Sequence, residues 1–387
     1  MQAFDRRSAT AFIVAFGIVS LFADMAYEGM RGLNGPFLAS LGASGTAVGF
    51  IAGGGELAGY LIRLISGRIA QRTGAYWPLA IGGYGLSMLA APLMTFAFGW
   101  QVAAVFVVLE RTGKAIRSPA TNTMQAKAGD HIGQGWAFGL EEALDQTGAV
   151  IGPLITAVVL ARHGDFHAAY AWLAVPALLT MLTVFTVAMR YRFAGHVAVE
   201  AARTSDTALS RAFWLYALSA GLLGFGFADF SLMALHFSRA GIVAPATIPV
   251  FYAAAMGASA IGALVFGLWF DRRGMTVLVP AILLGAMTTP LAFGGGVAEA
   301  LTGTVLWGLA TGTQNALMSA GVAKLVPERQ RARAYGTFSA IYGVSWFAGS
   351  ALLGTLYDRS PAALIAVAVA AQLASLIPFV AALRSKA

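Results

Sequence analysis

Apolar stretches long enough to cross a lipid bilayer recur along the whole sequence of 387 residues. A membrane-spanning helix needs about 20 mostly apolar residues. Stretches of this kind begin near twelve positions: Ala9, Thr46, Tyr76, Gln101, Gly133, His167, Arg211, Ile248, Met275, Thr302, Ala332 and Pro361. Only 11% of the residues are charged, against about 25% in soluble domains. The sequence therefore predicts an all-α integral membrane protein with twelve transmembrane helices in a lipid bilayer.

Basic residues outside these stretches are distributed unevenly. With the N-terminus placed in the cytoplasm, 17 Lys or Arg residues lie in cytoplasmic ends and loops, and three lie on the other side: Arg162, Arg239 and Arg359. Cytoplasmic loops of membrane proteins carry such an excess of positive charge. We therefore expect a multi-pass protein of the cytoplasmic (inner) membrane with both termini in the cytoplasm. The net charge of +8 then reflects topology, and nucleic acid is not an expected partner.

Short segments of the first half recur in the second. The triplet Phe-Ala-Asp at residues 22–24 recurs at 227–229, residues 67–79 resemble 267–278, and residues 126–139 resemble 323–336, with offsets of 205, 200 and 197 residues. Three repeats in the same order indicate two duplicated six-helix halves, at 1–190 and 211–387, joined by a cytoplasmic linker at 191–210. Parallel repeats are typical of secondary transporters, whose substrate site lies near the membrane midplane.

Two loop segments carry a resemblance to a known family. Residues 67–74 (GRIAQRTG) and 267–274 (GLWFDRRG) resemble the G-x-x-x-D-R-x-G motif of the major facilitator superfamily, with Gln71 in place of the first Asp. The resemblance covers the whole chain and implies two pseudo-symmetric halves that open alternately to either side of the membrane. It implies a gating role for eight residues: Gly67, Arg68, Arg72, Gly74, Gly267, Asp271, Arg272 and Gly274.

The fifth predicted helix carries a second motif. Gly139, Gly148, Gly152 and Pro153 fit the pattern G-x8-G-x3-G-P, and Thr156 and Ala157 stand where the family motif ends in two further glycines. This pattern is typical of the superfamily's proton-coupled drug and metabolite exporters. Small residues let a membrane helix pack closely on its neighbour, so simple packing is the alternative interpretation.

Thirteen charged residues lie inside the predicted spans: Asp24, Glu28, Arg31, Glu56, Arg63, Glu110, Arg111, Lys114, Arg117, Glu141, Glu142, Asp145 and Asp229. A charge at the centre of a lone membrane helix costs about 2.5–3.5 kcal/mol, so these side chains must face protein, water or one another. Within one helix, separations of four and three residues place Asp24, Glu28 and Arg31 on one face. The sequence therefore predicts a charged cavity wall, mainly in the first half.

Roles follow from sign and position. Proton coupling is predicted for five acids: Asp24, Glu28, Glu141, Glu142 and Asp145. Structural ion pairs are predicted for Glu56, Arg63, Glu110 and Arg111. Substrate contacts are predicted for three cations of the first half and for polar or aromatic residues of the second: Arg31, Lys114, Arg117, Asp229, Gln314, Asn315, Tyr342 and Trp346. The cations favour an anionic substrate and the acids oppose it, so its charge stays open.

The leading hypothesis is a proton-coupled exporter (antiporter) of a small organic molecule, acting as a monomer. The proton gradient drives it, with no cofactor, because the phosphate-binding pattern G-x-x-x-x-G-K-[ST] is missing from the sequence. An uptake symporter and an exporter of metal ions or metal chelates are the alternatives. The sequence has five His and no Cys and shows no metal-ligand cluster, and no paired nucleophile and base indicates an enzyme.

Overall fold

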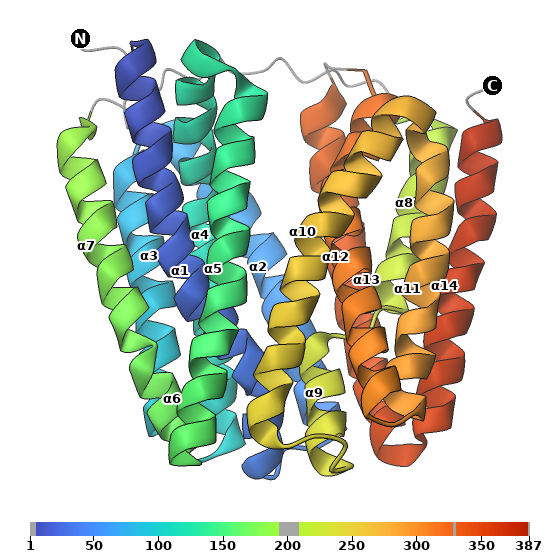
Figure 1. Ribbon diagram of the computed structural model, residues 1–387. Helices are drawn as coiled ribbons and strands as arrows, with labels where there is room; N and C mark the ends of the chain where they lie inside the picture. The colour runs from blue at the N-terminus through green and yellow to red at the C-terminus, as the bar shows by residue number, and fades with distance from the viewer. Residues whose placement is uncertain (1–4, 193–208, 328–329, 386–387) are drawn as a thin grey trace. The chain divides into compact units, whose positions relative to one another are not determined.

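The computed structural model describes residues 5–192, 209–327 and 330–385, and within these residues the regular elements are all helical (Figure 1). The α-helices are α1 (Arg6–Ser40), α2 (Gly45–Thr73), α3 (Tyr76–Leu93), α4 (Trp100–Ile132), α5 (Gln134–His163), α6 (Phe166–Trp172), α7 (Ala174–Arg190), α8 (Arg211–Phe225), α9 (Phe230–Arg239), α10 (Ile248–Arg273), α11 (Leu278–Gly294), α12 (Val297–Leu325), α13 (Arg331–Arg359) and α14 (Pro361–Arg384). Short 3-10 helices are η1 (Met94–Phe96), η3 (Pro245–Thr247) and η4 (Gly274–Val277).

The helices follow the predicted spans closely. Each predicted stretch contains one α-helix, except the sixth, which holds α6 and α7, and the seventh, which holds α8 and α9. Among the described residues, nine stretches are long and apolar enough to cross a membrane, and one of them, Pro245–Gly294, contains both α10 and α11. Helix α4 is not one of the nine, and it carries four of the buried or half-buried charges discussed below.

The two broken spans differ from the single helices that were expected. Between α6 and α7, Pro176 has no N–H to donate to the carbonyl of Trp172, so the helix is interrupted at Leu173. Between α8 and α9, the chain leaves the helix after Phe225 and resumes at Phe230, where the Asp229 carboxylate accepts a hydrogen bond from the N–H of Ser231 at 2.8 Å. Asp229 is therefore a helix cap.

Side chains satisfy the backbone at the α8–α9 break. The carbonyl of Ala228 accepts a hydrogen bond from the Trp307 indole at 2.9 Å, and that of Gly226 accepts one from the Gln372 amide at 3.0 Å. Lipid offers no donors, so non-helical backbone persists in a membrane only where protein or water supplies them. The repeated Phe-Ala-Asp triplet thus has two structural roles, since Asp24 lies within the continuous helix α1.

Two compact units make up the chain. The first contains Met1–Phe37, Ala58–Glu200 and Pro245–Ala253, and the second contains Leu38–Leu57, Ala201–Ala244 and Ala254–Ala387. The units differ from the predicted halves by two exchanged segments, because α2 begins in the second unit and α10 begins in the first. Most of the predicted linker, residues 193–208, lies outside the described residues.

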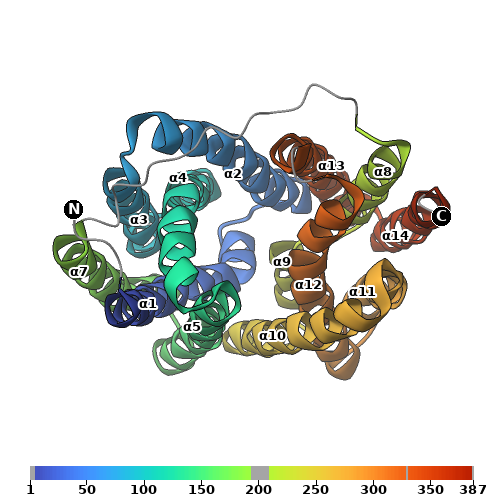
Figure 2. The same cartoon turned by 90° about the horizontal axis from the view of Figure 1, so that it is seen from above.

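In the first unit, α3 packs against α4 and α7, and α4 packs against α5 (Figure 2). The start of α1 and the end of α7 lie on the same side of this unit (Figure 1), as an even number of crossings requires. Aromatic side chains fill the core near that side, where the Phe12 ring lies 5.3 Å from that of Tyr191 and 6.4 Å from that of Trp77. This core anchors α1, which carries part of the candidate site.

In the second unit, α8 packs against α13 and α14, and α11 packs against α12 and α14. The first turns of α2 belong to this unit because α13 holds them. The Asp358 carboxylate accepts hydrogen bonds from the N–H groups of Gly45 and Thr46, both at 2.7 Å. A carboxylate at a helix N-terminus satisfies otherwise unpaired donors and interacts favourably with the helix dipole.

Candidate functional site

Ionisable side chains gather in the interior of the first unit, where α1, α4 and α5 meet. Asp24 and Glu110 are each 3% exposed, Glu28 is 6% exposed and Arg117 is 8% exposed. Isolated charges so deeply buried would be very costly. Opposite charges from α1 and α4 therefore compensate one another, and α5 contributes further acids.

Glycine brings α5 close to α1. A methyl group at Gly148 would overlap the carbonyl of Leu21, and one at Gly152 would overlap that of Met25. The close approach places Asp145 of α5 beside Asp24 of α1, near enough for the two carboxyl groups to interact electrostatically. A proton shared by this acid pair, Asp24 and Asp145, would remove the repulsion between two adjacent carboxylates.

A second feature of the site is a set of cations around Tyr27. Its hydroxyl accepts hydrogen bonds from the guanidinium groups of Arg111 at 2.6 Å and Arg31 at 3.2 Å, and the Lys114 ammonium lies 3.9 Å from the ring centroid. The partial negative charge on an aromatic face attracts cations. We call Tyr27, Glu28, Arg31, Glu110, Arg111 and Lys114 the Tyr27 cluster.

Two acids complete the Tyr27 cluster. Glu28 lies 4.0 Å from Arg31 and accepts a short hydrogen bond from the Tyr252 hydroxyl at the start of α10. Glu110 lies 3.7 Å from Arg111. Glu110 and Arg111, for each of which a structural ion pair was predicted, thus lie within ion-pair distance of each other, and Glu28 is held between α1 and α10.

The remaining charges of the first unit lie around this centre. Arg117 donates to the Tyr84 hydroxyl at 3.1 Å, with its guanidinium over the Tyr84 ring. Glu141 is half-buried and accepts from the Ser20 hydroxyl at 2.9 Å. Glu142 is exposed and accepts from the Gln146 amide at 2.9 Å. The structure therefore groups Glu141 with the acid pair and directs Glu142 away from it.

Predicted substrate contacts in the second unit lie among aromatic rings. The Tyr342 hydroxyl donates to the Gln314 side chain at 3.0 Å, and the Trp346 ring lies 5.6 Å from that of Tyr342. The buried indole N–H of Trp346 has no hydrogen-bond partner within the described part of the chain, so it is a free donor. The side chain of Asn315 lies outside the described residues.

The two predicted gating loops end in the same backbone geometry. Gly74 and Gly274 have φ of 66° and 67°, a left-handed conformation that suits glycine. Arg68, Arg72, Asp271 and Arg272 are exposed, and Gly67 and Gly267 are half-buried. The gating roles of these residues stay predictions.

Two further predictions concern α2 and α5. Arg63 is exposed, and its guanidinium lies 5.8 Å from the Tyr60 ring centroid. Glu56 belongs to the second compact unit and Arg63 to the first, so an ion pair between them stays a prediction. In the α5 motif, Gly148 and Gly152 make the close contacts with α1, Pro153 lies beside Gly32, and Gly139 has open space around it.

Sequence reasoning missed three members of the site. Ser20 and Tyr27 precede Asp24 and Arg31 by one helical turn, so spacing along α1 was a usable signal. Tyr252 lies 224 residues from Glu28, and no local pattern indicates that contact. These residues supply the neutral hydrogen-bond partners of the site.

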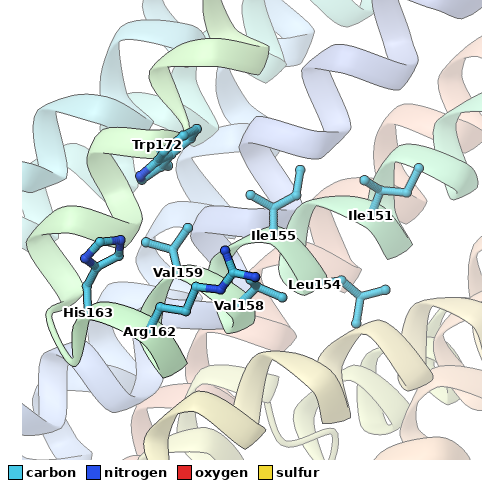
Figure 3. Close-up of a pocket in the computed structure, with 8 residues that line it drawn as sticks. All are labelled: Ile151, Leu154, Ile155, Val158, Val159, Arg162, His163 and Trp172. Atoms are coloured by element: carbon cyan, nitrogen blue, oxygen red, sulfur yellow. The ribbon is translucent and has the colours of Figure 1, made fainter.

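A separate groove of about 400 Å³ lies along α5 and α6. Figure 3 shows its apolar wall of Ile151, Leu154, Ile155, Val158 and Val159, with Arg162, His163 and Trp172 towards one end. It has no acidic lining residue, which sets it apart from the charged interior. Among the described residues, no group of three or more His, Asp or Glu side chains is arranged to hold a metal ion.

Comparison with known proteins identifies the fold and family. The family model described as Major Facilitator Superfamily matches residues 9–350. The chain belongs to this superfamily. Membership of this superfamily makes the chain a multi-pass membrane transporter, with the twelve-helix major facilitator fold.

Several superfamily relatives match over nearly the full length. An uncharacterized protein of Mycobacterium tuberculosis is 39% identical over 377 residues, which cover 96% of this chain and 92% of that protein. An uncharacterized transporter of the same superfamily from Methanocaldococcus jannaschii is 22% identical over 367 residues, covering 92% and 90%.

Solved structures of superfamily members match the fold at low sequence identity. A point mutant of the nucleoside transporter NupG has a TM-score of 0.78 at 14% identity, covering 97% of this chain and 99% of that one. A point mutant of the peptide transporter POT has a TM-score of 0.75 at 14% identity, covering 99% of each chain. At these identities the likeness establishes the fold alone.

Proposed function

We propose that the chain is a proton-coupled secondary active transporter of a small organic molecule, driven by the proton gradient through alternating access of its halves. The close placement of Asp24 and Asp145 carries this proposal, because a proton that the pair gains or loses changes the repulsion between the two carboxyl groups. Two carboxylates this close cannot both ionise cheaply. The acid pair also acts electrostatically on Lys114 and Arg117, two predicted substrate contacts.

Export by antiport is the first candidate for direction. It rests on the resemblance of Gly139, Gly148, Gly152 and Pro153 to the exporter motif. In an exporter of this kind, substrate and proton exclude each other, so the substrate displaces the proton of the acid pair. The acids of α5 lie on the same helix as the motif, which supports a common role.

Uptake by symport is a second candidate, and the position of Lys114 favours it. This half-buried ammonium lies within electrostatic range of Asp24, Glu28 and Asp145. A substrate that engages Lys114 weakens its interaction with the acid pair, and the pair then binds a proton more readily. Substrate and proton would then travel together.

An imposed pH gradient across proteoliposomes distinguishes the candidates. With the outside more acidic and the protein oriented as in the cell, an antiporter expels the substrate from the lumen and a symporter accumulates it. If the pH gradient changes neither the uptake nor the release of a substrate found by screening, proton coupling is contradicted.

We also propose that the protein works as a monomer in the cytoplasmic membrane, with both termini in the cytoplasm. The 17 basic residues on one side against three on the other support this orientation. The exposed Asp271 and Arg272 are proposed to pair with neighbouring helix ends in one transport state. An Asp271→Asn variant is then expected to slow turnover while substrate binding persists.

A further inference from the structure

We propose that the Tyr27 cluster binds the negatively charged group of the substrate, which is therefore a small organic oxyanion, a carboxylate or a phosphate ester. This inference rests on the proposed transport function and names its substrate class. It starts from the three cations that α1 and α4 direct at one tyrosine.

The Lys114 ammonium is the most direct indication. It has three N–H donors, yet within the described part of the chain it makes no hydrogen bond and no ion pair. Its one close contact is the face of the Tyr27 ring, at 3.9 Å from the centroid. Lys114 is half-buried, so a bound molecule can reach its donors. An oxyanion supplies acceptors that match them in number and charge.

The cations of the Tyr27 cluster are more exposed to solvent than its acids. The side chains of Arg31 and Arg111 are 19% and 12% exposed, whereas those of Glu28 and Glu110 are 8% and 4% exposed. The cations of the cluster are therefore more accessible than its acids. Guanidinium groups bind carboxylate and phosphate through paired N–H donors. The more accessible charges of the cluster are thus positive, which favours an incoming anion over an incoming cation.

Charge balance links the anion to the proton site. The cations of the first-unit interior are Arg31, Arg111, Lys114 and Arg117, and the acids are Asp24, Glu28, Glu110, Glu141 and Asp145. With one proton on the acid pair, four positive charges face four negative charges. An added anion leaves one excess negative charge, which a second proton on the pair removes. Binding of the anion is therefore expected to draw in a proton, which agrees with the symport candidate and not with antiport.

Neutral groups at the site agree with this arrangement. The hydroxyls of Tyr27 and Tyr84 each accept a hydrogen bond from arginine, and the Tyr252 hydroxyl donates to Glu28. They orient the charged side chains without adding charge. Glu142 is exposed and lies outside this balance.

Thermal unfolding of the purified protein with ligands that differ in charge tests the proposal. Succinate, putrescine and butanediol share a four-carbon chain, and glycerol phosphate pairs with glycerol. At about 10 mM, a ligand that binds the folded state raises the unfolding temperature. We expect stabilisation by succinate, glycerol phosphate or both, and none by putrescine, butanediol or glycerol. Stabilisation by succinate indicates a carboxylate substrate, and stabilisation by glycerol phosphate indicates a phosphate ester.

Variants locate the effect. Lys114→Gln is expected to weaken binding of the stabilising anion about tenfold, the value of one charge-assisted hydrogen bond, and Lys114→Arg is expected to retain most of it. Lys324→Gln is the matched control, because Lys324 lies 4.3 Å from the centroid of the Phe270 ring in the second unit. The affinity of the Lys324→Gln variant for the anion should equal that of the wild type. If Lys114→Gln does not fold, the wild-type ligand series decides alone.

The proposal is overturned if neither anion stabilises the wild type, if putrescine stabilises it instead, or if Lys114→Gln binds the anion as tightly as Lys324→Gln. Its failure is separable from failure of proton coupling. If a pH gradient drives transport of a neutral or cationic substrate, the proposed anion site is wrong and proton coupling still holds. If an anion binds and is transported without proton movement, proton coupling is wrong and the anion site still holds.

Discussion

Tyr27 is the residue on which the charged interior of the first unit converges. Two arginines donate to its hydroxyl and Lys114 lies over its ring. Tyrosine suits this position because it offers an acceptor at one end and a partly negative face along its side. Phenylalanine at this position would keep the contact with Lys114 and lose the hydrogen bonds from Arg31 and Arg111.

The residue-scale picture was only partly predictable. Spacing along α1 placed Asp24, Glu28 and Arg31 on one face, and all three contribute to the site. The partnership of Asp24 with Asp145, and that of Glu28 with Tyr252, depend on helix packing between residues far apart in sequence. A pattern within one helix contains no information about which turn of another helix will face it.

Trp307 provides a prediction at this scale. Replacing it by Phe removes the hydrogen bond to the Ala228 carbonyl at the α8–α9 break, and a buried acceptor without its partner costs about 1–3 kcal/mol. We expect a clearly lower unfolding temperature. Trp214→Phe is the matched control, because Trp214 is 49% exposed and its loss should change little. Equal unfolding temperatures for the two variants would show that the break does not need this bond.

At the scale of helices, the predicted starts lie within five residues of the observed helix starts, because long apolar stretches indicate membrane helices. The breaks in the sixth and seventh spans were not predicted. Pro176 was a visible signal for the first break. The second depends on Trp307 and Gln372 from other helices, which hydropathy cannot indicate.

The contact between α1 and α5 gives the element-scale prediction. Gly148→Ala forces a methyl group against the carbonyl of Leu21, and overpacking of this kind costs about 1–3 kcal/mol. Thermal unfolding should show this loss, and transport should fall as Asp24 and Asp145 separate.

Gly139→Ala is the control from the same motif. Among the described residues, nothing lies within 4 Å of the added methyl group, and Gly→Ala in a helix is neutral or stabilising by about 0.4–1 kcal/mol. If both variants lose the same stability, the motif does not act through close packing of α5 on α1.

For the whole molecule, the even number of spans and the asymmetric basic residues predict where the loops lie. A cysteine at Ser205, in the predicted linker, should resist an impermeant thiol reagent in intact cells, because this segment is expected in the cytoplasm. The sequence has no cysteine of its own, so labelling reports on the introduced site alone. A cysteine at Ala244, between α9 and α10, is the control and should react. Ready labelling of the cysteine at position 205 would show that the linker lies outside the cell and that the predicted topology is wrong.

The measurement that tests the central claim most directly is proton movement driven by a substrate gradient alone. Proteoliposomes with a pH-sensitive dye inside and no imposed pH gradient receive substrate on one side. Wild-type protein is expected to change the internal pH as substrate moves. The double variant Asp24→Asn, Asp145→Asn is expected to bind substrate without moving protons, because amide side chains of nearly the same shape cannot gain or lose a proton. A double variant that moves protons like the wild type would contradict the assignment of coupling to the acid pair.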